Sequence, residues 1–108
     1  MFIIYKRTAK KELFPIGVFN DLVYLDYWFE KLKDQMDAVG EGRFRCLKFW
    51  ADEECHIGVI DSNSRYAKYH DDKEINHNSS LLKALSTYYY CVRQIIWLDE
   101  DDNYKYES

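Results

Sequence analysis

The amino-acid sequence predicts an α+β fold in which a small antiparallel sheet packs against two amphipathic helices. Three features support this: a β-rich N-terminus, a run of apolar residues at helical spacing after residue 20, and two central β-rich segments joined by a short acidic stretch. The sheet would combine the N-terminal strand with a central hairpin or meander. The helices would span about residues 21–39 and 80–97. Because 108 residues is a common domain size, we expect a single globular domain over 1–108.

The first strand is predicted at residues 2–7, which are rich in apolar and aromatic side chains. Residues 13–19 have two possible interpretations, a second short strand or an apolar loop. Pro15 would restrict such a strand to a sheet edge, because proline has no N–H to donate to a neighbouring strand.

The first helix has the clearest pattern in the chain. Asn20 or Asp21 can act as its N-cap, and Gly40 stands where a left-handed residue would end it. Its predicted core face recurs at spacings of three and four residues and consists of Leu22, Leu25, Phe29, Leu32, Met36 and Val39.

A β-hairpin is predicted from residues 43–50 and 55–60, joined by the four residues 51–54. If Trp50 pairs with Cys55, one face of the hairpin is apolar and only Lys48 interrupts it. That face carries Phe44, Cys46, Trp50, Cys55, Ile57 and Val59. The opposite face mixes basic and aromatic residues and is expected to be partly exposed; it carries Arg43, Arg45, Leu47, Phe49, His56 and Ile60.

The second half of the chain is harder to assign. Residues 65–70 would add a third strand to the hairpin, and the polar residues 71–79 would form a surface loop. The second helix follows at about 80–97. Its composition from Tyr89 onward also favours a strand, so a switch from helix to strand near that residue stays open. From about residue 99 the tail is acidic and is expected to be mobile.

Composition indicates a cytoplasmic protein. The chain is 47% hydrophobic and 18% aromatic, which is enough to build a core without disulfides or a structural metal. The cysteines are odd in number, widely spaced and free of any C-x-x-C pair, as expected of free thiols in a reducing compartment. The first residues do not have the order of charged and apolar regions that a signal peptide requires, and no apolar stretch is long enough to cross a membrane.

No residue pattern in the sequence indicates catalysis, a metal or a cofactor. His70 and His77 flank an acidic segment with Asp71 and Asp72, but their spacing is not that of a zinc site. The chain also lacks a G-x-S-x-G elbow, a glycine-rich phosphate loop and a recognisable Cys–His signature. We therefore expect a protein that is not an enzyme and holds no cofactor, with an enzyme of unrecognised type as a second alternative.

Nucleic-acid binding is the first alternative function. Arg43, Arg45, Lys48, Phe49 and His56 would place cations for phosphates and rings for bases on one face of the hairpin. The acidic residues at the tip of the same hairpin count against this, because phosphate contacts dominate the affinity of nucleic-acid complexes.

The composition favours a module that binds another protein with a basic surface. Tyrosine is enriched at protein interfaces, and here tyrosines stand beside clusters of acids in a chain of net charge −4. We expect an inhibitor or immunity-type protein that occludes a basic site on a partner such as a nuclease toxin, with carboxylates in place of phosphates. The predicted partner-binding residues are Asp52, Glu53, Glu54, Tyr66, Tyr69, Asp71, Asp72, Glu74, Asp99, Glu100, Asp101, Asp102 and Tyr104.

Overall fold

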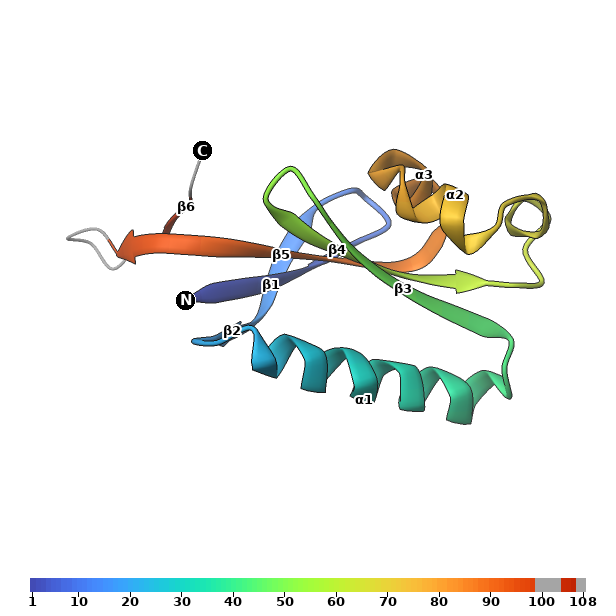
Figure 1. Cartoon of the computed structure of the whole chain (residues 1–108), viewed down its shortest axis with the longest axis horizontal. Helices are drawn as coiled ribbons and strands as arrows, with labels where there is room; N and C mark the ends of the chain where they lie inside the picture. Colours follow the sequence, from blue (N-terminus) through green and yellow to red (C-terminus); the bar gives the residue numbers. More distant parts are fainter. Residues whose placement is uncertain (99–103, 107–108) are drawn as a thin grey trace.

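The computed structural model describes residues 1–98 and 104–106. Within them, five antiparallel strands form a sheet in the order β2-β1-β5-β4-β3, and β6 pairs with the far part of β5 (Figure 1). The predicted α+β class is confirmed. The strands are β1 (Phe2–Arg7), β2 (Leu13–Phe19), β3 (Phe44–Ala51), β4 (Glu54–Asp61), β5 (Ser86–Leu98) and β6 (Tyr104–Tyr106). The helices are α1 (Val23–Gly40), the 3-10 helix η1 (Ala67–Tyr69), α2 (Asp72–Asn76) and α3 (Ser79–Leu85).

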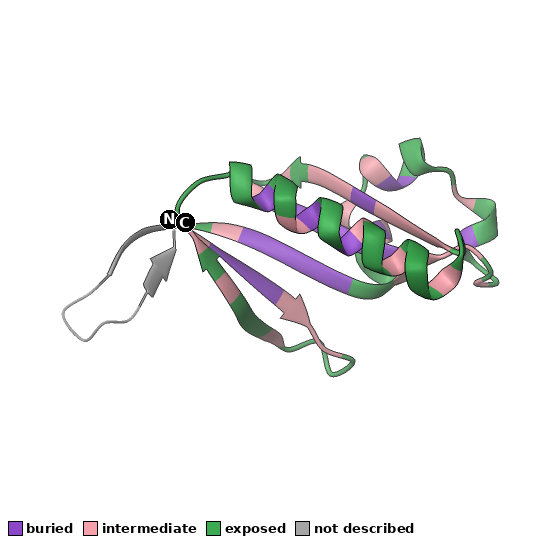
Figure 2. Ribbon diagram, turned by 90° about the horizontal axis from the view of Figure 1, so that it is seen from below, coloured by how far each residue is buried: buried purple, intermediate pink, exposed green. Residues whose placement is uncertain are grey.

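The two faces of the sheet have separate cores. α1 lies along one face, whereas α2 and α3 lie on the other side, near one end of the sheet (Figures 1 and 2). None of the described helices is both long and apolar enough to cross a membrane. The buried residues on the α1 side are Ile4, Leu25, Phe29, Leu32, Cys55, Ile57, Val59, Tyr90 and Val92. Those on the opposite side, below α2 and α3, are Leu47, Ile60, Ala67, Ile75, Leu82, Tyr89 and Cys91.

The N-terminal strands agree with the sequence pattern. β1 is the predicted first strand, and residues 13–19, which the sequence left as strand or loop, form β2. β2 lies at the edge of the sheet, where Pro15 is tolerated because a missing N–H on the outer side breaks no ladder. The register shifts between Ile4 and Tyr5, next to this proline.

The first predicted helix is confirmed as α1, and Leu25, Phe29 and Leu32 of its predicted core face are buried. Leu22 and Val39, at the two ends of that face, are exposed and were wrongly assigned to the core.

The N-cap of α1 is Leu22, which makes no side-chain capping bond, and not Asn20 or Asp21 as predicted. The side chain of Asp21 does accept a hydrogen bond from the N–H of Val23 (3.1 Å). The left-handed residue at the other end is Glu41 (φ 52°), and not Gly40 as predicted. Gly40 has a different role, because a Cβ at this position would lie 2.6 Å from the ring of Phe44.

The predicted hairpin and its register are confirmed, with Trp50 opposite Cys55. The connection is shorter than the predicted four residues, since Ala51 and Glu54 also pair. The turn therefore contains only Asp52-Glu53, and both of these residues have positive φ (53° and 64°), as in a type I′ hairpin turn.

The second predicted helix, about 80–97, is wrong beyond its first turns. α3 ends at Leu85, and β5 runs from Ser86 to Leu98. The switch left open near Tyr89 occurs three residues earlier. β5 occupies the middle of the sheet, and residues 89–92 are buried on both faces, so apolar residues there do not alternate with polar ones and resemble a buried helix in sequence.

Two shorter predictions are also wrong. Residues 65–70 do not form a third hairpin strand, because η1 lies there; the guanidinium of Arg45 donates to the carbonyls of Ala67 and His70 at 3.2 and 3.3 Å and helps hold this turn. The predicted loop at 71–79 contains α2 and the start of α3. Of the predicted mobile tail, residues 99–103 and 107–108 lie outside the described residues, whereas 104–106 form β6.

Candidate functional site

The acidic turn between β3 and β4 contains the first predicted partner-binding cluster. Asp52 and Glu53 are exposed at its tip, as expected for residues that meet a partner. Glu54 is different: its carboxylate lies 2.8 Å from Nε of Arg93 on β5, and it also accepts a hydrogen bond from the Cys91 thiol. Only the first two acids of this cluster are therefore directed to solvent.

The second predicted cluster lies around η1 and α2. Tyr66 and Tyr69 are largely exposed, at 66% and 80%. The acids beside them have intramolecular partners. Asp71 and Glu74 form a capping box at the start of α2, and Asp72 forms an ion pair with Arg45 (2.8 Å). These carboxylates are exposed, and each also has an intramolecular partner that stabilises the local fold.

The structure does not bring the two clusters together. The turn lies at one end of the β3–β4 ladder and the pair Phe44–Asp61, after which the chain continues toward η1, lies at the other. Seven residue steps separate the ends, which is about 24 Å of strand. Of the third cluster, Asp99, Glu100, Asp101 and Asp102 lie outside the described residues, and Tyr104 belongs to β6.

The basic residues of the hairpin do not form a shared cationic face. Lys48 is on the α1 side of the sheet, where it pairs with Asp26 at 2.7 Å. Arg43 binds Asp61 through two hydrogen bonds, which lowers the pKa of that carboxyl to about 2. On the other face Arg45 pairs with Asp72, and Phe49 is stacked on the buried His56. The predicted basic–aromatic face is partly exposed, at Arg43, Arg45 and Phe49, but its two arginines are held in ion pairs.

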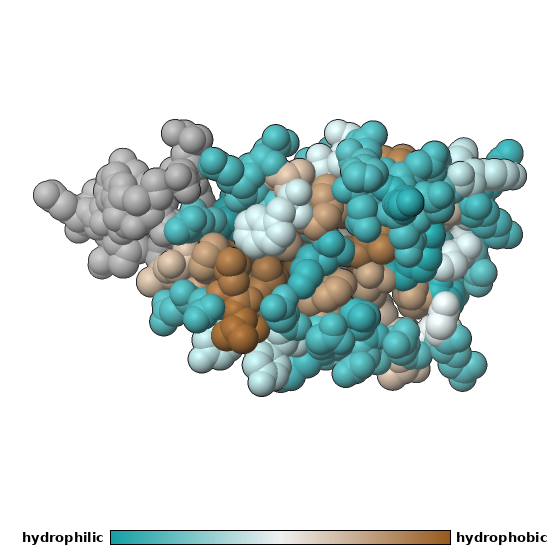
Figure 3. Space-filling view, in the orientation of Figure 1, coloured by the Kyte–Doolittle hydropathy of each residue, from teal (hydrophilic) through white to brown (hydrophobic). Residues whose placement is uncertain are grey.

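An exposed apolar surface that the sequence did not predict lies where α1 begins. The outer face of the helix presents Val23 and Tyr27 to solvent, beside Asp26 and Glu30. Figure 3 shows apolar side chains gathered at this part of the molecule. The signal in the sequence was the off-stripe position of these two apolar residues on an otherwise charged helix face.

A second exposed aromatic residue on the α1 side of the sheet is Trp50 on β3. From the end of α1, β3 runs back along the helix and diverges from it toward the hairpin turn (Figure 1). Lys48 on β3 pairs with Asp26 in the first turn of α1. Trp50 lies two residues further in the same direction and on the same face of the sheet. It is 50% exposed. The turn Asp52-Glu53 follows directly in the chain, so two exposed acids lie next to this aromatic residue.

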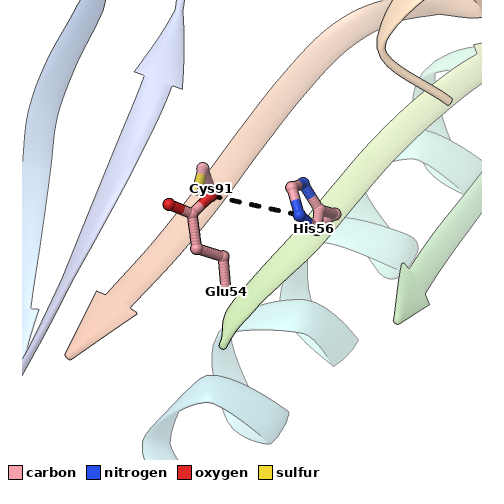
Figure 4. Close-up of side chains that lie close together, drawn as sticks. All are labelled: Glu54, His56 and Cys91. Atoms are coloured by element: carbon pink, nitrogen blue, oxygen red, sulfur yellow. Dashed lines mark hydrogen bonds and ion pairs between the residues drawn. The ribbon is translucent and has the colours of Figure 1, made fainter. Parts of the chain in front are cut away.

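A buried polar cluster lies on the opposite face, between β4 and β5. The antiparallel register places His56 directly opposite Cys91, and Glu54 is two residues from His56 on the same face of β4 (Figure 4). One ligand atom from each of these three residues lies within 4.8 Å of the other two. His56 and Cys91 are 7% and 2% exposed, so the cluster is enclosed except on the side of Glu54.

Each atom of the cluster has a defined contact. Glu54 Oε2 accepts from Cys91 Sγ (3.1 Å) and lies 4.0 Å from His56 Nε2, whereas Oε1 faces Arg93. The other imidazole nitrogen, Nδ1, is hydrogen-bonded to the Tyr89 hydroxyl. This leaves Nε2 and Oε2 directed toward the thiol, with the remaining atoms of both side chains held by neighbours.

The protonation of the cluster does not suit a cysteine nucleophile. Burial raises the pKa of the Cys91 thiol to about 12, and the hydrogen bond to Glu54 adds to this rise. Burial lowers the pKa of His56, so its imidazole is neutral near pH 7. A nucleophilic cysteine needs a lowered pKa, because the thiolate is the reactive form. The three donor types instead suit a cation of intermediate softness.

His70 and His77, which flank the acidic segment in the sequence, do not form a shared site with the acids between them. His70 Nδ1 lies 3.2 Å from a carboxylate oxygen of Glu74, within one turn of chain, whereas His77 is exposed at the end of α2. His56 cannot share an ion with its neighbour Cys55, because adjacent strand residues point to opposite faces of the sheet. The cysteine beside His56 is Cys91, on another strand.

No protein family matches the chain, and neither does any curated protein or solved structure. The chemistry of the described surfaces is therefore the basis for a functional proposal.

Proposed function

We propose that this protein is a protein-binding module that recognises a partner with a basic surface. The binding surface is the acidic–aromatic end, formed by Val23, Asp26, Tyr27, Glu30, Trp50, Asp52 and Glu53. The observation that carries the proposal is that Trp50, on the α1 side of β3 and two residues before the acidic turn, is half exposed. A large aromatic ring that is exposed in the free protein contributes much binding free energy when a partner buries it.

The backbone of the turn supports this assignment. Asp52 and Glu53 both have positive φ, a conformation in which asparagine and glycine are preferred. Carboxylates thus stand where other residues would make a more stable hairpin. Strain of this kind, when it is retained at a surface, points to a role for the side chains.

The charges define the class of partner. Asp52 and Glu53 are exposed and follow the aromatic residue directly. Carboxylates next to apolar rings suit a partner site rich in arginine or lysine, such as the phosphate-binding surface of a nuclease. The proposed mechanism is that of an inhibitor or immunity-type protein, which occludes the site and associates rapidly because opposite charges steer the encounter. The three free thiols support a reducing, cytoplasmic location.

The test is capture of the partner from a lysate of the source cell, with the tagged full chain at low and moderate salt. A Trp50→Ala/Tyr27→Ala variant removes the aromatic groups of the proposed surface. Val39→Ala is the matched control, because it shortens an exposed apolar side chain near the other end of α1. A Tyr66→Ala/Tyr69→Ala variant tests the second predicted cluster.

The proposal requires one stoichiometric partner with a basic surface, captured by the native chain and by Val39→Ala but lost with Trp50→Ala/Tyr27→Ala. A partner that is lost only with Tyr66→Ala/Tyr69→Ala would move the interface to η1 and contradict the assignment. Recovery of nucleic acid in place of a protein, released by moderate salt, would support the alternative function.

A further inference from the structure

We infer that Glu54, His56 and Cys91 form a binding site for a single Zn²⁺ ion, with one coordination position left open. The inference is independent of the proposed function, because none of these residues belongs to the acidic–aromatic end. It depends on the geometry and the donor types of the cluster, which combines oxygen, nitrogen and sulfur.

The distances fit a tetrahedral site. Zinc lies about 2.0–2.2 Å from oxygen and nitrogen ligands and about 2.3 Å from sulfur, so ligand atoms in a tetrahedron are about 3.3–3.6 Å apart. The Cys91 Sγ to Glu54 Oε2 distance is 3.1 Å, and the His56 Nε2 to Glu54 Oε2 distance is 4.0 Å. These values lie on either side of the required range. Small side-chain rotations on a fixed backbone would therefore bring the atoms into position.

The neighbours of the three ligands orient them as in metal sites. Metal-binding histidines usually use one ring nitrogen for the ion and hydrogen-bond the other to a polar group. Here the Tyr89 hydroxyl binds Nδ1 of His56 and leaves Nε2 on the side of the cluster. Arg93 lies against Oε1 of Glu54 and leaves Oε2 for the ion. Phe49, stacked on the imidazole, further fixes the ring.

The register of the sheet supplies the rigid frame. β5 is the central strand and β4 is its neighbour, so the backbone atoms that carry the ligands are paired along their length. The side chain of Glu54 is 30% exposed and provides the way in from solvent. The fourth position, on this exposed side, would hold a water molecule or a donor atom from a bound molecule.

Binding of the ion replaces the S–H bond of Cys91 with a bond from sulfur to the ion. The S–H bond of Cys91 breaks, its proton leaves to solvent, and the thiolate forms a bond to the ion. The carboxylate and thiolate together balance the two positive charges of Zn²⁺. A thiolate ligand also separates this site from sites for Ca²⁺ or Mg²⁺, which take oxygen donors.

The test uses the reduced, tag-free full chain and titration with Co²⁺, which reports thiolate ligation by a charge-transfer band and tetrahedral geometry by visible absorption. The expected result is a band that saturates at one equivalent and is abolished by Zn²⁺. The band should disappear in Cys91→Ala and persist in Cys46→Ala, a matched control whose cysteine lies on the other face of the sheet. Circular dichroism establishes that each variant is folded.

A second variant keeps the inference testable if Cys91→Ala does not fold. Tyr89→Phe removes only the hydroxyl that orients His56, and should weaken Co²⁺ binding by about 10- to 100-fold. The inference is overturned if the folded native chain gives no thiolate band, if the band survives in Cys91→Ala, or if affinity is unchanged in Tyr89→Phe.

Discussion

Glu54 and Arg93 form an ion pair across the two central strands, with the carboxylate oxygen 2.8 Å from Nε. This pair divides the acidic segment at the hairpin tip into two parts. Asp52 and Glu53 point to solvent and belong to the proposed interface. Glu54 faces the buried cluster and belongs to the proposed metal site. Three consecutive acids in the sequence thus serve two different surfaces.

The backbone of the turn gives a prediction that separates stability from binding. A left-handed conformation destabilises the folded state by about 1–2 kcal/mol for a non-glycine residue. Glycine removes this cost, but its greater entropy in the unfolded chain offsets about 0.5–1 kcal/mol of the gain. Replacing Glu53, which has φ 64°, by Gly should therefore stabilise the protein by about 0.5–1 kcal/mol. Urea unfolding measures this change.

The same variant should associate more slowly with the partner, because it loses a steering charge. Asp52→Asn is the matched control, since asparagine tolerates the left-handed region; it should slow association with a stability change within about 0.5 kcal/mol. A Glu53→Gly variant that is both less stable and unimpaired in binding would contradict the role given to this turn.

Gly58 on β4 is expected to tolerate no side chain. A Cβ there would lie 2.4 Å from Leu82 Cδ1 and 2.3 Å from the Ser86 hydroxyl, at the contact between α3 and the sheet. Gly58→Ala should reduce the free energy of unfolding by about 1–3 kcal/mol through overpacking. In a Leu82→Ala background the loss should be smaller by at least about 0.5 kcal/mol, since part of the clash is removed. If urea unfolding shows that the two substitutions change the free energy of unfolding additively, Gly58 and Leu82 are not in the contact described.

Asp71 should have a structural role and not a binding role. Its side chain accepts from the Glu74 N–H (2.7 Å) and completes the capping box of α2. Asp71→Ala should cost about 1 kcal/mol of stability and leave partner capture unchanged. Asp72→Asn serves as the comparison, because it breaks only the ion pair with Arg45, worth about 0–1 kcal/mol. If the Asp71→Ala variant is folded but no longer captures the partner, Asp71 belongs to the interface and this prediction is wrong.

The ion pair between Arg43 and Asp61 predicts a dependence of stability on pH. The pKa of Asp61 is lowered to about 2 by Arg43 and by the N–H of Asn63, from 3.8 in the unfolded chain. A lowered pKa in the folded state means that the stabilisation is present above pH 4 and is lost as the pH falls through 2. Asp61→Asn should therefore be less stable than the native chain at pH 6, and the difference should shrink between pH 4 and pH 2. A constant difference across this range would exclude the ion pair as its cause.

The parts of the fold that the sequence predicted are those set by local chemistry. The α1 stripe has helical spacing over five turns, and the β3–β4 register follows from the short turn that joins Trp50 to Cys55. The prediction of a helix fails at β5 because residues 89–92 are buried on both faces of the sheet. Tyr88, Tyr90 and Val92 point to one side and Tyr89 and Cys91 to the other. The two-residue alternation of apolar and polar side chains that marks a strand is therefore missing, and a helix fits the sequence equally well.

The candidate sites depend on contacts that sequence does not fix. His56 and Cys91 are 35 positions apart, and their pairing depends on the path of residues 62–85, which contain η1, α2 and α3. No local rule sets that register. For Trp50 the sequence predicted the correct face of the hairpin but not its exposure, which arises because the residue lies near the end of β3, beyond the ion pair of Lys48 with α1.

The most direct test of the acidic–aromatic end is the association rate with the captured partner, measured by stopped-flow fluorescence at increasing salt. If carboxylates at the turn steer the encounter, raising salt from about 0.02 to 0.5 M should slow association at least about tenfold and change dissociation much less. The Asp52→Asn/Glu53→Gln variant should show a weaker dependence on salt. An association rate that does not vary with salt in the native chain would contradict the proposal.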